Sequence, residues 1–170
     1  NTKIRIFKEF FNINFKKKYI NKFKPPKIIT ITNVFAHIND LDDFTKALKA
    51  ITDIDSIIII EFPYLPYMIE KITYDIIYHE HLSYISLTPL KKFFNKYGFK
   101  IFNVEKINFG ASGPSLRVFV SKSKSKFKIN KSVNKLLIYE KKWGIKKISN
   151  YKKFSQNVIM NKNELKNLIH

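Results

Sequence analysis

Four consecutive isoleucines, residues 57–60, form the longest aliphatic run in the sequence. An unbroken apolar run of this length between turn signals is typical of a strand covered on both faces. It is too short to cross a membrane, which takes about 20 apolar residues. The sequence therefore predicts a buried central strand over residues 56–62.

A second strand and a helix precede this central strand. Residues 27–32 have the pattern of another buried strand, and Asp40 is placed to cap a helix that runs to about Ile51. Strand, helix and strand at this spacing predict a parallel βαβ unit, so we expect an α/β fold.

The second half predicts different elements. Thr88 is expected as the N-cap of a helix, with Pro89 in its first turn and Gly98 at its end. Residues 99–107 and 115–121 read as strands joined by a loop, which predicts an antiparallel hairpin at one edge of the sheet.

Helices are expected at both ends of the chain. Near the amino terminus, Phe15, Tyr19 and Phe23 recur at four-residue steps, as on one face of a helix. A linker over residues 121–126 leads to a helix that ends at Gly144. A last helix is marked by apolar residues at helical spacing, namely Tyr151, Phe154, Val158 and Ile159.

Composition excludes several classes of protein. The 170 residues are enough for one domain with a sizeable core, and the absence of cysteine excludes disulfides and a cysteine-built zinc site. No signal segment opens the chain, so the cytoplasm is the expected compartment. The chain starts at Asn1 rather than Met and stops at His170 within a helical pattern, which suggests a fragment.

The net charge of +19 permits two interpretations. All the excess lies in residues 1–26 and 121–170, because residues 27–120 carry equal numbers of acidic and basic side chains. Lys-rich flanks could bind a polyanion, or A/T-rich codons could have filled solvated positions with lysine. Only Arg5 and Arg117 are arginines, although nucleic-acid surfaces favour arginine, so nucleic acid is not the favoured partner.

Chemically active side chains occur at two places. Tyr78, His79, Glu80 and His81 follow the central strand, and His37 follows the strand before it. The carboxyl ends of parallel strands meet at one edge of a sheet, so both clusters should face one cleft. A histidine can accept a proton near neutral pH, a carboxylate such as Glu80 can orient it, and a tyrosine can donate to an oxyanion.

These residues also permit less specific interpretations. His37 alone could be a structural hydrogen-bonding residue, and His79 with His81 could bind a metal. Neighbouring residues of an extended chain point in opposite directions, however, so the two histidines would need a turn to share one ion. We therefore expect no metal site.

Four segments resemble the sugar C-methyltransferases: residues 33–38, 59–63, 75–84 and 115–118. The resemblance implies a class I, Rossmann-like methyltransferase sheet, incomplete at its amino terminus, with an antiparallel edge hairpin and a carboxy-terminal helical pair. Residues 1–121 would form the C-terminal half of the methyltransferase core. Residues 122–170 would be a linker and helices that lead into a missing C-terminal domain.

The resemblance also implies an activity: methyl transfer from S-adenosylmethionine to a ring carbon beside the ketone of a nucleotide-linked keto-deoxysugar. His81 would be the general base, Tyr78 and Glu80 would shape the site, and His37 would reach the sugar. Asn33 and Val34 would line the methionine end of the cofactor.

Departures from the family pattern leave alternatives open. The chain has four glycines and no glycine-rich cofactor loop, which is expected upstream together with a zinc-binding domain. Residues 111–114 replace the family's usual His-Gly-Gly. The isolated chain would then be inactive, and a non-catalytic remnant or binding module, or a basic polyanion-binding protein, are the alternatives.

Overall fold

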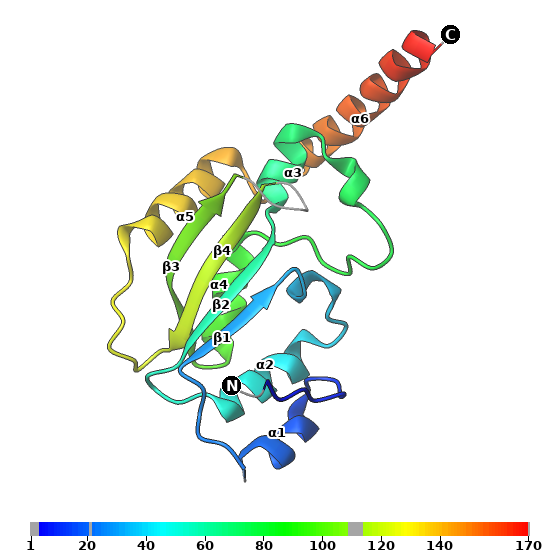
Figure 1. Ribbon diagram of the computed structural model, residues 1–170. Helices are drawn as coiled ribbons and strands as arrows, with labels where there is room; N and C mark the ends of the chain where they lie inside the picture. Colours follow the sequence, from blue (N-terminus) through cyan, green and yellow to red (C-terminus); the bar gives the residue numbers. More distant parts are fainter. Residues whose placement is uncertain (1–3, 21, 109–113, 170) are drawn as a thin grey trace.

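The computed structural model describes residues 4–20, 22–108 and 114–169. Its described strands form one sheet in the order β1-β2-β4-β3 (Figure 1). The strands are β1 (Ile28–Thr32), β2 (Ile57–Pro63), β3 (Phe99–Ile107) and β4 (Ser115–Lys122). β1 and β2 are parallel, whereas β4 runs antiparallel to both of its neighbours. The predicted α/β fold, with its parallel pair and antiparallel hairpin, is confirmed.

Helices precede, connect and follow these strands. They are α1 (Ile13–Ile20), α2 (Leu41–Ile51), α3 (Leu65–Lys71), α4 (Leu87–Lys96), α5 (Lys131–Trp143) and α6 (Ile148–Ile169). Two short 3-10 helices, η1 (Phe35–His37) and η2 (Tyr74–Ile76), lie in the segments that follow β1 and α3.

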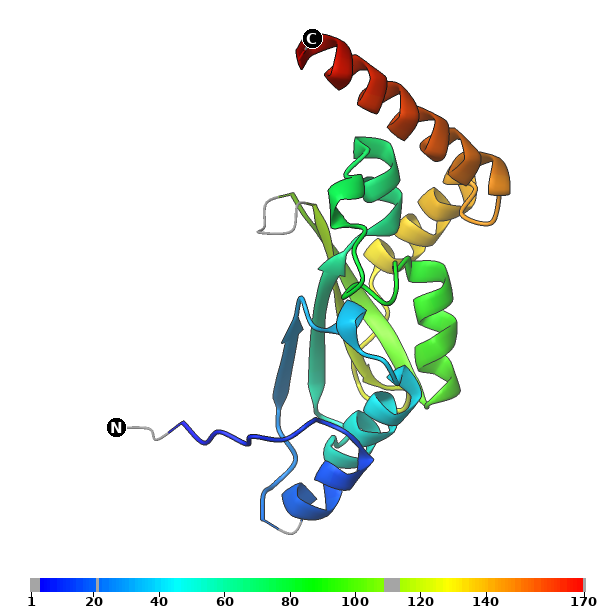
Figure 2. The ribbon, with the colours of Figure 1, turned by 90° about the vertical axis from the view of Figure 1, so that its right-hand side faces the viewer.

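One face of the sheet carries the core. Ile58, Ile60 and Phe62 of β2 are fully buried and pack with apolar residues of α2, α4 and α5. Figure 2 shows these helices on one side of the sheet. The alternate residues of β2, such as Ile59, are half-buried, so the expected cover on both faces is found on only one face among the described residues.

Of the helix caps predicted from the sequence, the structure corrects the one at Thr88. Asp40 caps α2 as predicted, because its side chain accepts a hydrogen bond from Asp43 N at 2.8 Å. The predicted N-cap at Thr88 is wrong: α4 begins at Leu87 after Ser86, and Thr88 donates its hydroxyl to Glu140 instead. Gly98 lies directly beyond α4 with φ at +78°, a left-handed conformation that favours glycine.

The last helix leaves the body of the protein. Tyr151, Phe154 and Val158 are half-buried near the start of α6, whereas all its described residues after Val158 are exposed. Figure 1 shows the carboxy-terminal part of α6 projecting away from the sheet. Among the described helices, none is long and apolar enough to span a membrane.

Candidate active site

The structure brings His37 and His81 together. His37 ends η1, which follows β1, and His81 lies in the segment between η2 and α4. Their ring centroids are 4.7 Å apart. The backbone N–H of Leu82 donates to the carbonyl of Ala36 at 2.9 Å, so one backbone hydrogen bond ties the two histidine-bearing segments to each other.

Hydrogen bonds at His81 fix which ring nitrogen can act as a base. Nδ1 lies 2.7 Å from the carbonyl oxygen of Ile76, which can only accept, so Nδ1 carries the proton. In the neutral ring Nε2 is then the acceptor, and the hydroxyl of Tyr78 lies 3.0 Å from it. Tyr78 is 43% exposed and His81 is half-buried, so this pair lies outside the core.

Glu80 and His79 are not part of this contact group. Both side chains are exposed, and neither makes a hydrogen bond or an ion pair with another residue in the described part of the chain. A backbone carbonyl therefore takes the orienting position at His81 that a carboxylate could have filled. No group of three His, Asp or Glu side chains among the described residues is arranged to hold a metal ion.

Asn33 and Val34 lie at the carboxyl end of β1. Asn33 adopts a left-handed backbone with φ at +53°, and its N–H donates to Glu61 O at 3.0 Å. Val34 is exposed and lines a cavity of about 460 Å³ that also contains His37. Phe10 and other residues of the amino-terminal arm form part of the same cavity wall, a contribution that sequence reasoning missed.

An ion pair links β2 to β4, the strands that contain residues 59–63 and 115–118. Glu61 of β2 and Arg117 of β4 are cross-strand neighbours, and the Arg117 Nε and a terminal nitrogen lie 3.0 and 2.8 Å from Glu61 Oε2. The hydroxyl of Ser115 donates to Glu61 Oε1 at 2.8 Å. Pro114 is the only residue of the altered loop over 111–114 that lies within the described residues.

A second carboxylate, Glu140, was missed by sequence reasoning. It is fully buried, and its oxygens accept from Tyr64 OH at 2.7 Å, from the backbone N–H groups of Leu87 and Thr88, and from the Thr88 hydroxyl. Burial and the neighbouring charge of Glu140 raise the pKa of Tyr64 far above its usual range. The sequence did contain a signal that Glu140 is buried, because helical spacing places it on the apolar face of α5 with Val133.

This buried contact lies next to the segment that carries His81. Tyr64 pairs with Ile85 in an isolated parallel bridge, and Leu65 N donates to Ile85 O at 3.0 Å. The segment between η2 and α4 is therefore held near its middle by Ala36, at Ile85 by Tyr64 and Leu65, which directly follow β2, and at Leu87 by Glu140. These attachments place His81 beside His37.

The chain is similar in sequence to known C-methyltransferases. The family model "C-methyltransferase C-terminal domain" matches residues 110–170. C-methyltransferase NovU from Streptomyces niveus is 29% identical over 121 residues, which cover 71% of this chain and 28% of that protein. The chain is thus similar to C-methyltransferases over its carboxy-terminal third by the family model and over most of its length by NovU.

The chain spans just over a quarter of the length of that curated relative. Among solved structures, magnesium protoporphyrin IX methyltransferase (ChlM) from Synechocystis PCC 6803 with bound SAH matches with a TM-score of 0.44 and 13% identity. That match covers 59% of this chain and 47% of the other. The strand order, with one parallel pair and an antiparallel hairpin, agrees with the predicted α/β fold class.

Proposed function

We propose that this chain supplies the proton-abstracting half of a C-methyltransferase site, with His81 as the general base. The observation that supports the proposal is the hydrogen bond from His81 Nδ1 to Ile76, which leaves Nε2 as the basic nitrogen. The proposed substrate is a nucleotide-linked keto-deoxysugar, methylated at a ring carbon beside its ketone. The similarity to NovU supports carbon as the acceptor atom.

His81 would remove the proton from that ring carbon. The proton is acidic because the adjacent carbonyl can hold the negative charge that remains, so the site needs a base at carbon and a donor at oxygen. When the substrate proton takes the place of the Tyr78 hydroxyl at Nε2, that hydroxyl becomes available to donate to the oxygen. The His37 ring, 4.7 Å away, would contact the same sugar.

S-Adenosylmethionine, when bound, supplies the methyl group on a positively charged sulfur. The residues that fit this donor are Asn33 and Val34, because they end β1 beside His37 and Val34 lines the neighbouring cavity. Glu80, which is exposed, would contact the substrate from the rim rather than orient His81. The chain's residues would thus hold donor and acceptor on either side of the histidines.

The test separates proton removal from methyl transfer. In the protein that carries this chain, His81→Ala should lower methyl transfer by about 10²–10⁴-fold, the usual contribution of a general base. Exchange of the proton beside the ketone with deuterium oxide, measured by NMR without methyl donor, should fall by a similar factor. His79→Ala is the matched control: it removes an exposed histidine two residues away and should leave both rates near wild type.

Retention of proton exchange in His81→Ala would remove His81 from the role of base. Loss of methyl transfer with unchanged exchange would assign it to a later step. If the wild-type protein neither exchanges this proton nor transfers a methyl group to any nucleotide-linked ketosugar, the proposed activity is wrong.

A further inference from the structure

Ile72, which directly follows α3, has a left-handed backbone with φ at +54° and ψ at +35°. This region suits glycine and asparagine, whereas for a β-branched residue it is a strained outlier. The other non-glycine residue with a positive φ in the described part of the chain is Asn33, a residue type that tolerates it. Strain of this kind persists only where the surrounding structure fixes it, and it often marks a functional segment.

The turn at Ile72 closes the end of α3. The N–H of Thr73 donates to the carbonyl of Met68 at 3.1 Å, and the N–H of Ile72 donates to the carbonyl of Ile69 at 3.4 Å. This pair of hydrogen bonds is the Schellman motif, in which glycine usually occupies the left-handed position. Met68 and Ile69 are buried, so the core fixes the helix end from which the turn starts.

Two further tight turns follow directly. Thr73 has φ at −80° and ψ at +63°, an inverse γ-turn, and the N–H of Tyr74 donates to the carbonyl of Ile72 at 2.9 Å. The 3-10 helix η2 comes next, where the N–H of Ile77 donates to the carbonyl of Tyr74 at 2.9 Å. The chain from α3 to the end of η2 is thus a run of consecutive hydrogen-bonded turns.

These turns end at the carbonyl that orients His81. The oxygen of Ile76, the last residue of η2, lies 2.7 Å from His81 Nδ1 and keeps the proton on that nitrogen. No residue of η2 is buried, so the core does not hold this carbonyl in place. Its position depends on the turn at Ile72 before it and on the hydrogen bond from Leu82 to Ala36 after it.

We infer that Ile72 is a positioning residue for the base, an inference that rests on the proposed function. Its left-handed turn directs the chain so that the Ile76 carbonyl faces His81 Nδ1. A backbone with negative φ at this point would send the chain after α3 in another direction and move the carbonyl away from the ring. The histidine's own segment thus supplies the orientation that a carboxylate could have given.

The orientation matters because a neutral histidine carries one proton on either of two nitrogens. The Ile76 carbonyl can only accept, so it selects the form with the proton on His81 Nδ1. Without this carbonyl the ring could also carry its proton on Nε2, and that form cannot accept a proton there. A displaced turn should therefore reduce the share of His81 that is able to act as a base.

The test compares two substitutions at position 72 with opposite backbone preferences. Ile72→Gly accepts the left-handed conformation without strain, whereas Ile72→Pro fixes φ near about −65° and excludes it. Heteronuclear NMR of the imidazole nitrogens, on the protein that carries this chain, measures the tautomer of His81, and the His81→Ala spectrum assigns its signals. Wild type and Ile72→Gly should show the Nδ1–H form, and Ile72→Pro should show a mixture of both forms.

Steady-state kinetics give a second readout. Ile72→Pro should lower kcat for methyl transfer by about 10–100-fold, because a small misplacement of a catalytic group has an effect of this size. KM for the methyl donor should change little, and Ile72→Gly should keep kcat close to wild type. Wild-type tautomer and kcat in Ile72→Pro would overturn the inference. So would equal losses in both variants, because the side chain rather than the direction of the backbone would then carry the effect.

A milder pair of variants covers the case in which Ile72→Pro does not fold. Thr73→Pro suits the local φ of −80°, but it removes the N–H that bonds to Met68 and biases Ile72 toward an extended backbone. Thr52→Pro is the matched control, because it removes the corresponding N–H bond at the end of α2, before β2 begins. Thr73→Pro should shift the His81 tautomer in the same direction as Ile72→Pro, and Thr52→Pro should not. A wild-type tautomer in folded Thr73→Pro would overturn the inference.

The inference and the proposed function can fail separately. If residue 72 controls the tautomer of His81 but His81→Ala retains proton exchange, the turn still orients this ring and the proposed function is wrong. If methyl transfer depends on His81 while the proline variants keep the wild-type tautomer and kcat, the proposed function stands and the turn has no positioning role.

Discussion

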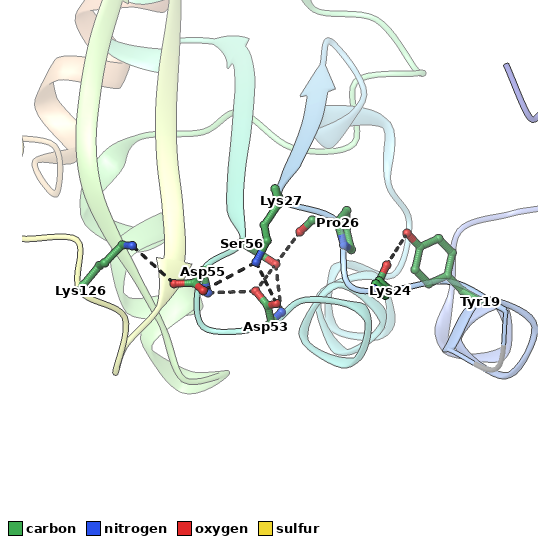
Figure 3. A network of polar contacts seen from close by, with 8 residues as sticks. All are labelled: Tyr19, Lys24, Pro26, Lys27, Asp53, Asp55, Ser56 and Lys126. Atoms are coloured by element: carbon green, nitrogen blue, oxygen red, sulfur yellow. Dashed lines mark hydrogen bonds and ion pairs between the residues drawn. The ribbon is translucent and has the colours of Figure 1, made fainter. Parts of the chain in front are cut away.

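Two networks of carboxylates differ in the way the protein surrounds them. Glu140 lies in the interior, where four donors from two different segments surround one fully buried side chain. The other network, shown in Figure 3, joins Asp53 and Asp55 to Lys27, Ser56 and Lys126 near the start of β2. Its charged members are between 36% and 77% exposed.

This difference in exposure to water indicates which of the two networks contributes more to the stability of the fold. Water screens the exposed ion pairs and can replace each partner, so such pairs contribute about 0–1 kcal/mol each. Water cannot reach Glu140, so the loss of this acceptor would leave several buried donors without a partner. Glu140 is also the link between α5 and the segment that bears His81.

Replacement of Glu140 should have the largest effect. Glu140→Ala leaves the Tyr64 hydroxyl and the first N–H groups of α4 unpaired, and it opens a cavity in the core. We expect the free energy of unfolding to fall by about 3–5 kcal/mol, measured by urea denaturation. Glu140→Gln keeps the volume and one oxygen, so it should cost less than Glu140→Ala. Wild-type stability in Glu140→Ala would show that the buried network contributes nothing.

Removal of one donor from the same carboxylate should cost less. Tyr64→Phe takes away the hydroxyl that lies 2.7 Å from Glu140 Oε1, but that oxygen keeps the Leu87 N–H. A hydrogen bond to a charged group contributes about 1.5–3 kcal/mol, and we expect a loss in this range by urea denaturation. Tyr67→Phe, in the neighbouring ring, is the matched control and should cost less.

Alkaline pH should act through Tyr64. Burial and Glu140 raise its pKa, so the native phenol keeps its proton while the unfolded phenol loses it near pH 10. Fewer protons are then bound in the unfolded state, so the free energy of unfolding must fall as the pH rises above about 10. Tyr64→Phe should make this fall shallower by up to about 1.4 kcal/mol per pH unit, measured by denaturation between pH 9 and 11. An unchanged slope would mean that the buried phenol ionises as readily in the native state as in the unfolded state.

Much of this molecule follows from local sequence signals, and the buried network does not. The isoleucine run, the Asp40 cap and Gly98 predicted β2, α2 and the end of α4, because each depends on neighbouring residues alone. The cap at α4 was wrong because a residue 52 positions away competes for Thr88. Only the tertiary fold brings Glu140 there.

The same limit applies to the candidate active site. The parallel direction of the two predicted strands was enough to predict that the segments of His37 and His81 approach one edge of the sheet. The partner of His81 Nδ1 was not predictable from the sequence, because it is a backbone carbonyl and every residue type has one.

On the exposed side, Asp53 should have a small effect that depends on pH. The hydroxyl of Ser56 lies 2.9 Å from its Oδ1, and this hydrogen bond, with a further contribution from Lys27, lowers the pKa of Asp53. The stabilisation is therefore present above the unfolded pKa of about 3.9 and is lost as the pH falls through the lower native pKa. Asp53→Asn should cost less than about 1 kcal/mol at pH 7, and the cost should vanish at pH 2. A cost that persists at pH 2 would mean that the side chain acts through shape rather than charge.

Lys126 should have the smallest effect of all. Its ammonium lies 3.8 Å from Asp55 and is 77% exposed, so water and salt screen the attraction and the long side chain loses entropy to hold it. Lys126→Ala should leave the free energy of unfolding unchanged within about 0.5 kcal/mol, at low salt and at 0.5 M sodium chloride alike. A loss as large as that of Tyr64→Phe would contradict the comparison, because burial would then not decide which network stabilises the fold. Since Asp55 also lies 3.7 Å from Lys27, the variant leaves that carboxylate with a cation and tests the weakest contact alone.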